Sequence, residues 1–192
     1  MPTQIRSLHL GLYEYWLTKR GSRAMPARSD LDPADIPQLL PHLLIVEKVA
    51  ERFRYRLVGT AVVQEVGRDL TGDFVGSYVS DPEPAASMRA IYMRAFTRLQ
   101  PVFAAGRFNL KSGAIHNMSL LVLPLSNDGT HVNMVIANHA TRFDPGLRAS
   151  REWLKGMPFK VDILEIGSTE DLEKYCSKWE QCSESLTKAP TT

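Results

Sequence analysis

The sequence predicts an α+β domain built on a single antiparallel sheet. Two short strand patterns come first, one long amphipathic helical pattern lies in the middle, and three further strand patterns follow it. Strands in two clusters around a helix are typical of this class rather than of alternating parallel units. With 192 residues, of which 44% are hydrophobic and 23% charged, the chain is long enough to bury a core of its own.

A helix is predicted over residues 5–19, ahead of the sheet. Its apolar residues follow helical spacing, and Gly21 is a suitable stop. An apolar stripe at the end of a chain needs a cover, so we expect a homodimer that involves this helix. The stripe consists of Ile5, Leu8, Leu12 and Tyr15, with Trp16 beside it.

A lead-in rich in proline and aspartate occupies residues 25–41. Proline fixes φ and removes amide donors, so this segment is expected to be ordered but not repetitive. Asp32 can cap a short turn that starts at Pro33. Together with Asp30 and Asp35 it forms a carboxylate cluster, for which capping and turn formation are favoured over acid–base chemistry.

The first two strands are predicted at residues 43–47 and 53–58. The first is a short apolar run, and the second alternates, with Phe53, Tyr55 and Leu57 expected on one face. Gly59 ends the second strand. Thr60 can cap a short helix that runs to Val66, and Gly67 terminates it.

The long helix is predicted over residues 85–99, where Tyr92 and Phe96 lie four apart on one face. Pro101 ends it, and strands follow at 102–109, 118–125 and 132–140. In the tail, 161–166 is a candidate strand and 169–182 a candidate helix. The chain therefore divides into an N-terminal helix (1–22), a central domain (23–141) and a C-terminal extension (142–192).

Bulk properties exclude several functions. A net charge of +2 without a dense basic tract excludes a nucleic-acid surface. No secretion signal or membrane span is predicted, so the cytoplasm is the expected location and no membrane partner is expected. Cys176 and Cys182 lie six apart on a predicted helix, so we expect neither a disulfide nor a metal pair.

Three motifs resemble a family of stand-alone bacterial PAS-like proteins, largely alphaproteobacterial and known as the fifth PAS subfamily. The lead-in 25–33 (Met-Pro-Ala-Arg-Ser-Asp-Leu-Asp-Pro), continued by Ile36-Pro37 and Leu39-Leu40-Pro41, resembles the family's opening. Residues 53–60 (Phe-Arg-Tyr-Arg-Leu-Val-Gly-Thr) resemble its second strand, and 67–72 (Gly-Arg-Asp-Leu-Thr-Gly) the following turn. The resemblance covers about residues 10–140. It implies a five-stranded sheet, in the spatial order second, first, fifth, fourth, third, with helices on one face, and it implies no enzymatic activity.

The cofactors common in this fold each require particular residues. A covalent flavin adduct needs a core cysteine, and none is present. Haem binding usually needs a histidine on the central helix, and residues 85–99 contain none. His42, His116, His131 and His139 are dispersed over loops and strand ends, with His131 and His139 expected on one strand but too far apart for one metal. We therefore expect no haem, no covalent flavin, no metal and no catalytic site.

A ligand, if one binds, is expected between the long helix and the sheet. Its walls would be mostly apolar with a few polar groups, as in small-molecule pockets generally. Arg107 has two readings: facing inward it would need a carboxylate or an anionic ligand, and facing outward it is a solvated strand residue. The candidate ligand-binding residues are Phe53, Tyr55, Leu57, Tyr92, Phe96 and Arg107.

The predicted function is a sensory or regulatory PAS domain. It would bind a small apolar or weakly polar metabolite or a partner protein, and an unknown signalling protein would read the result through the N-terminal helix. One alternative is an interaction module whose core is simply filled. An unrecognised enzyme is the other.

Overall fold

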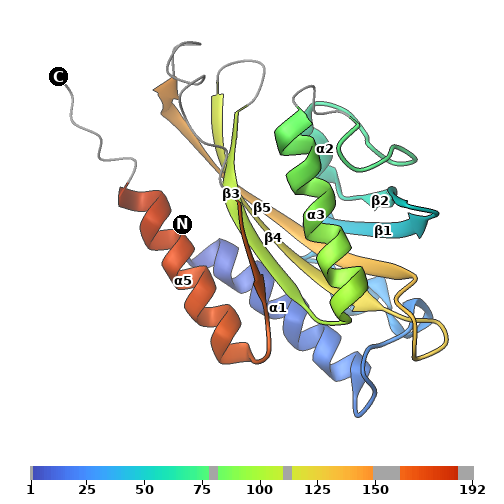
Figure 1. Ribbon diagram of the computed structural model, residues 1–192. Helices are drawn as coiled ribbons and strands as arrows, with labels where there is room; N and C mark the ends of the chain where they lie inside the picture. Colours follow the sequence, from blue (N-terminus) through green and yellow to red (C-terminus); the bar gives the residue numbers. More distant parts are fainter. Residues whose placement is uncertain (1, 78–81, 110–113, 149–160, 186–192) are drawn as a thin grey trace.

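The computed structural model describes residues 2–77, 82–109, 114–148 and 161–185, and only the backbone of residues 2–5, 107–109, 114–117, 142–148 and 182–185. Its helices and strands fold around one sheet (Figure 1). In chain order they are α1 (Pro2–Arg20), three 3-10 turns η1 (Arg28–Asp30), η2 (Pro33–Asp35) and η3 (Leu40–His42), β1 (Leu43–Val49), β2 (Arg52–Val58), α2 (Thr60–Val66), α3 (Pro82–Arg98), β3 (Val102–Asn109), β4 (Ala114–Leu125), β5 (Met134–Arg148), β6 (Val161–Glu165) and α5 (Thr169–Ser185).

The sheet is antiparallel with the order β2-β1-β5-β4-β3-β6. The predicted α+β class and the order of the first five strands are confirmed. The sixth strand comes from the C-terminal extension, where Val102 of β3 pairs with Glu165. The extension is thus part of the sheet and places α5 beside it.

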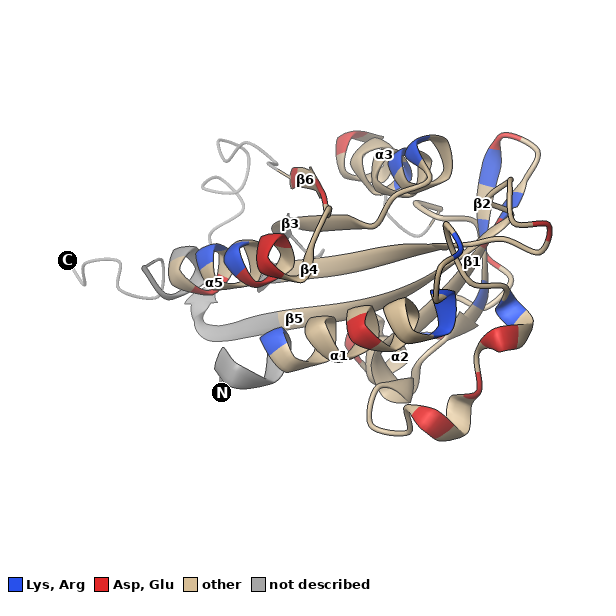
Figure 2. Ribbon diagram, turned by 90° about the horizontal axis from the view of Figure 1, so that it is seen from below, with Lys and Arg blue, Asp and Glu red and all other residues tan. Residues whose placement is uncertain are grey.

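The two faces of the sheet carry separate cores, and we name them after the helices that cover them. The α3 face packs against α2 and α3, and the α1 face packs against α1 and α5. Figure 2 shows the sheet on edge, with α3 above it and α1 below. The helices of the central domain, α2 and α3, therefore cover one face as expected, and the N-terminal helix and the C-terminal extension cover the other.

The N-terminal helix finds its cover within its own chain. Leu12, Tyr13 and Trp16 are 0%, 3% and 1% exposed, and they pack in the same core as Leu121 of β4 and Leu172 of α5. Burying a large apolar side chain contributes about 1.5–3 kcal/mol, so these residues hold α1 without a second subunit. The homodimer was predicted because the apolar stripe of this helix needed a cover, and at Leu12 the chain itself provides that cover. The homodimer stays a prediction.

Sterics explain why the second-strand motif (53–60) has glycine at position 59. A Cβ at Gly59 would lie 2.3 Å from the carbonyl oxygen of Pro41 and 2.6 Å from that of Leu40. These atoms belong to the backbone and cannot move aside, so only glycine fits. Gly59, rather than Thr60, is the N-cap residue of α2, while Gly67 ends that helix in the left-handed conformation as predicted.

The outer edge of β2 is not left open to other chains. Val75 donates its amide hydrogen to Phe53, and Tyr55 exchanges backbone hydrogen bonds with Gly72 and Asp73. This turn follows the Gly-Arg-Asp-Leu-Thr-Gly motif and covers the edge strand, which protects it from pairing with another sheet.

Candidate functional site on the α3 face

Four of the predicted ligand-binding residues meet in one aromatic cluster on the α3 face. Phe53 and Tyr55 come from β2, and Tyr92 and Phe96 from α3; their exposed fractions lie between 0% and 8%. Phe53 lies 5.1 Å from Phe96 and 6.1 Å from Tyr92 between ring centroids, and Tyr55 meets Tyr92 edge-on at 6.5 Å. Such contacts stabilise a core beyond the burial of area alone. The sequence predicted this meeting, whereas the binding role of the cluster stays a prediction.

Leu57 does not belong to this cluster, and its predicted inward orientation is wrong. Ile45 pairs with Leu57 but the next residue, Val46, pairs with Tyr55, so Arg56 is an extra residue in β2. Such a β-bulge reverses the alternation of side chains beyond it. Leu57 is consequently 40% exposed, on the far side of the strand from Tyr55.

Arg107 lies on β3, where its backbone pairs with Asn117. Its side chain lies outside the described part of the structure, so both readings of this arginine remain predictions.

Two polar residues that were not predicted join the α3 face beside the aromatic cluster. His139 lies on β5, two residues after the buried Ala137, and its Nδ1 is 3.4 Å from Oε2 of Glu65 on α2. The two side chains are only 10% and 23% exposed. A partly buried polar pair in apolar surroundings is a common mark of a binding site. Strand alternation could have placed His139 on the same face as Ala137. No pattern in the sequence predicts its contact with Glu65 of α2.

His131, which was expected on the same strand as His139, lies elsewhere. His131 precedes β5 in a loop, where it is bound to the carboxylate of Asp128 at 2.9 Å. The two histidines therefore do not share a strand. Within the described residues, no group of three or more His, Cys, Asp or Glu side chains could hold a metal ion.

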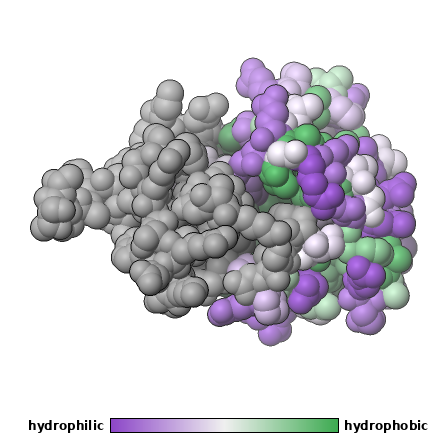
Figure 3. Space-filling view, turned by 90° about the horizontal axis from the view of Figure 1, so that it is seen from above, coloured by the Kyte–Doolittle hydropathy of each residue, from purple (hydrophilic) through white to green (hydrophobic). Residues whose placement is uncertain are grey.

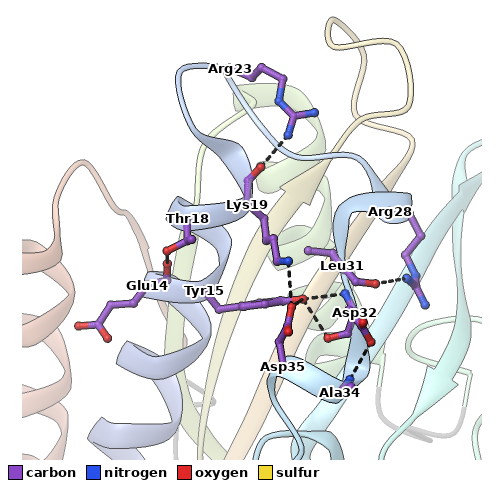
Figure 4. Close-up of polar contacts among 10 residues, drawn as sticks. All are labelled: Glu14, Tyr15, Thr18, Lys19, Arg23, Arg28, Leu31, Asp32, Ala34 and Asp35. Atoms are coloured by element: carbon purple, nitrogen blue, oxygen red, sulfur yellow. Dashed lines mark hydrogen bonds and ion pairs between the residues drawn. The ribbon is translucent and has the colours of Figure 1, made fainter.

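Asp32 and Asp35 of the lead-in bind backbone groups and residues of α1 rather than each other (Figure 4). Asp32 accepts a hydrogen bond from the Ala34 amide, and its backbone exchanges two hydrogen bonds with the Tyr15 hydroxyl, at 2.8 and 3.0 Å. Asp35 lies 2.8 Å from Nζ of Lys19. The predicted capping role of Asp32 is confirmed, and the lead-in is tied to the helix before it.

Hydrogen bonds keep two of these carboxylates charged. The Ala27 amide lowers the pKa of Asp30, and Lys19 lowers that of Asp35. A general acid needs a raised pKa near the working pH. Asp30 and Asp35 are therefore suited to holding the chain in place and unsuited to donating protons at neutral pH.

The one cysteine whose side chain is described sits deep in the core of the α1 face. Cys176 is 1% exposed, and burial raises the pKa of its thiol to about 12. A reactive thiol needs the opposite environment, exposed and with a lowered pKa. Cys176 thus acts as a small apolar residue.

None of the described helices is long and apolar enough to cross a membrane. Among the side chains that the structure describes, the exposed large apolar residues are Leu40, Leu57 and Leu99. On the described part of the surface in Figure 3, hydrophobic residues lie among hydrophilic ones.

Comparisons with known proteins identify the family of this chain. The chain is similar to the PAS domain of Bordetella pertussis BvgS, with 13% identity, a TM-score of 0.46, and coverage of 70% of this chain and 88% of that one. A comparison with curated proteins gives no match. A family model described as a PAS domain matches residues 6–137, more than half of the chain. The chain therefore belongs to the PAS-domain family.

Proposed function

We propose that this PAS domain is a sensory or regulatory module that binds a small, mostly apolar molecule on the α3 face and signals by contact with another protein. One observation carries the proposal: the pair of His139 and Glu65 is largely buried beside the hydrophobic core of the α3 face. Small-molecule sites combine apolar walls with a few polar groups that fix the orientation of the ligand. The packed rings of the aromatic cluster would form one side of the site, with the ligand beside them and not between them, and the pair would supply the polar contact.

The ligand chemistry follows from these groups. A histidine and a carboxylate can together accept and donate hydrogen bonds, so a hydroxyl or amide on the ligand is favoured over a strongly charged group. A metabolite with no polar atom could not form a hydrogen bond with the pair. We therefore expect a weakly polar metabolite.

The path of the signal would run through β5. Asn138 and His139 are neighbours whose side chains lie on opposite faces of the sheet, and Asn138 donates a hydrogen bond to the Leu8 carbonyl of α1 at 2.7 Å. A ligand that displaces His139 would shift the backbone that positions Asn138, and with it the packing of α1. A partner protein, or a second copy of the chain, would read that shift.

A second candidate is an interaction module with a filled core, and the direct ring contacts between Phe53, Tyr92 and Phe96 favour it. In both cases we propose no enzymatic activity, no haem and no covalent flavin. The helix α3 carries neither a histidine that could bind haem nor a cysteine that could form a flavin adduct. The cytoplasmic location also stays a prediction, which fractionation of cells would test.

A metabolite screen by thermal unfolding tests the proposal. At least one weakly polar compound should raise the Tm of the wild type, as any ligand selective for the native state does. His139→Asn should abolish that rise, while His131→Asn, a change of the same kind in an exposed loop, should keep it. A Tm rise that survives His139→Asn would refute the assigned site. If no compound acts on the wild type, the filled-core module remains.

A further inference from the structure

A buried polar network joins α1 to the centre of the sheet. His9 is 0% exposed and lies between Asn138 of β5 and Ser119 of β4. Its Nδ1 is 2.7 Å from Oδ1 of Asn138, and its Nε2 is 2.8 Å from Oγ of Ser119. These partners are 129 and 110 residues away along the chain, so nothing in the local pattern around His9 predicts them.

The directions of the hydrogen bonds fit a neutral imidazole. The amide nitrogen of Asn138 donates to the Leu8 carbonyl at 2.7 Å, which turns the amide oxygen towards His9. Nδ1 of His9 must therefore carry the hydrogen and donate it to Asn138. Nε2 is then the acceptor, and the Ser119 hydroxyl donates to it.

This order of serine, histidine and asparagine resembles a nucleophile with its base and orienting group. Catalysis is excluded by access, because Ser119 is 0% exposed and lies beneath α1. A substrate could reach the hydroxyl only if the helix left the sheet. The network therefore acts on the helix.

The surroundings of His9 disfavour a positive charge. Burial, followed by the charges of His139 on β5 and His42 on η3, lowers the pKa of His9 to about 4, although its bond to Asn138 acts in the opposite sense. From β3, the Phe103 ring meets the imidazole edge-on at 5.4 Å. From α5, Glu173 is engaged with Arg6, and both are more than 40% exposed. Among the residues whose side chains are described, no carboxylate acts on His9.

We propose that the His9–Asn138–Ser119 network is a pH-sensitive latch for the N-terminal helix: protonation of His9 weakens the docking of α1 on the sheet. The inference is independent of any ligand on the α3 face.

The proton would bind to Nε2 of His9, the atom that accepts the hydrogen bond from Ser119. Ser119 would then have to turn its hydroxyl, and the Ala140 carbonyl at 3.4 Å is the alternative acceptor. The new charge would still be buried without a counter-ion. When α1 lifts away, the imidazole regains water and its ordinary affinity for protons.

The size of the effect follows from the two proton affinities. With a pKa of about 4 when docked and 6.5 when solvated, the ratio of undocked to docked helix rises about 30-fold at pH 5 relative to pH 7.5. Apolar contacts of Leu12, Tyr13 and Trp16 oppose release, as does the hydrogen bond from Trp16 Nε1 to the Pro124 carbonyl at 2.8 Å. The latch thus loosens the helix and does not free it entirely.

Amide hydrogen exchange of the full chain, read by mass spectrometry at pH 7.5 and pH 5 and corrected for the intrinsic exchange rate, tests the latch. Peptides from α1 should show an opening equilibrium about 30-fold larger at pH 5. Peptides from α3 that exchange by local opening serve as the internal control and should change much less. His9→Gln, which keeps a polar side chain but cannot titrate, should remove the pH response, and the matched His42→Asn variant should keep most of it.

Two results would overturn the latch: an opening of α1 that does not change with pH, or a pH response in His9→Gln equal to that of the wild type. If His9→Gln fails to fold, the imidazole of the wild type can be followed by NMR during a pH titration. The latch requires that protonation of His9 and loss of protection in α1 occur together. Protonation of His9 with no change in α1 would equally refute it.

Discussion

Replacing Tyr92 by Ala tests whether the aromatic cluster holds the α3 face together. Tyr92 is 0% exposed and touches the rings of both Phe53 and Tyr55. A large aromatic side chain removed from a packed core costs about 3–5 kcal/mol, because the transfer free energy and a cavity term add. We expect a loss of this size in the free energy of unfolding.

The matched control is Leu57→Ala on β2. The alternating pattern treats Leu57 as the equivalent of Phe53 and Tyr55, but the bulge leaves it 40% exposed. Its truncation should cost less than about 1.5 kcal/mol, well below the range for a packed core leucine. Urea unfolding followed by circular dichroism measures both variants, with the midpoint shift multiplied by the slope m giving each loss.

Either of two results would refute this reasoning. Equal losses in the two variants would mean that the register of β1 and β2 is not as described. A loss below about 1 kcal/mol for Tyr92→Ala would mean that the ring lines an open space rather than a filled core.

Three further predictions concern other parts of the molecule. Gly59→Ala should lower the free energy of unfolding by about 1–3 kcal/mol or more, since the added Cβ would overlap the Pro41 carbonyl. An unchanged free energy in chemical unfolding would contradict the close approach. The pKa of His9 is lower in the folded state, so its contribution to stability is present above pH 6.5 and is lost as the pH falls. The free energy of unfolding should decrease by about 3 kcal/mol towards pH 4, and His9→Gln should flatten this decrease in its plot against pH. Leu12→Asp should unfold the chain rather than yield a folded monomer, because Leu12 is 0% exposed within its own chain; a folded, monomeric variant by sedimentation and circular dichroism would instead support the predicted dimer.

Local patterns in the sequence predicted the elements and their order. Helical spacing, strand alternation and the terminating glycines act between neighbours in the chain, so α1, α2, α3 and the strands could be placed within a few residues. The Pro82 start of α3 and the extension of β5 to Arg148 were missed at the boundaries. Such ends depend on tertiary contacts as well as on local preference.

The features that were missed depend on distant partners. The bulge at Arg56 is set by how β2 pairs with β1, so the exposure of Leu57 could not be read from alternation. The contacts of His9 with Asn138 and of His139 with Glu65 join segments far apart in the chain. Likewise, the α1 stripe indicated that a cover was needed but not that the sheet and α5 would supply it.

Native mass spectrometry of the protein purified from its own organism tests the central claim, ligand binding on the α3 face, most directly. We predict a wild-type peak that carries one small molecule per chain, lost in His139→Asn and kept in His131→Asn. A wild-type protein that is folded and bare under conditions that preserve weak complexes, or an adduct that His139→Asn retains, would contradict the claim.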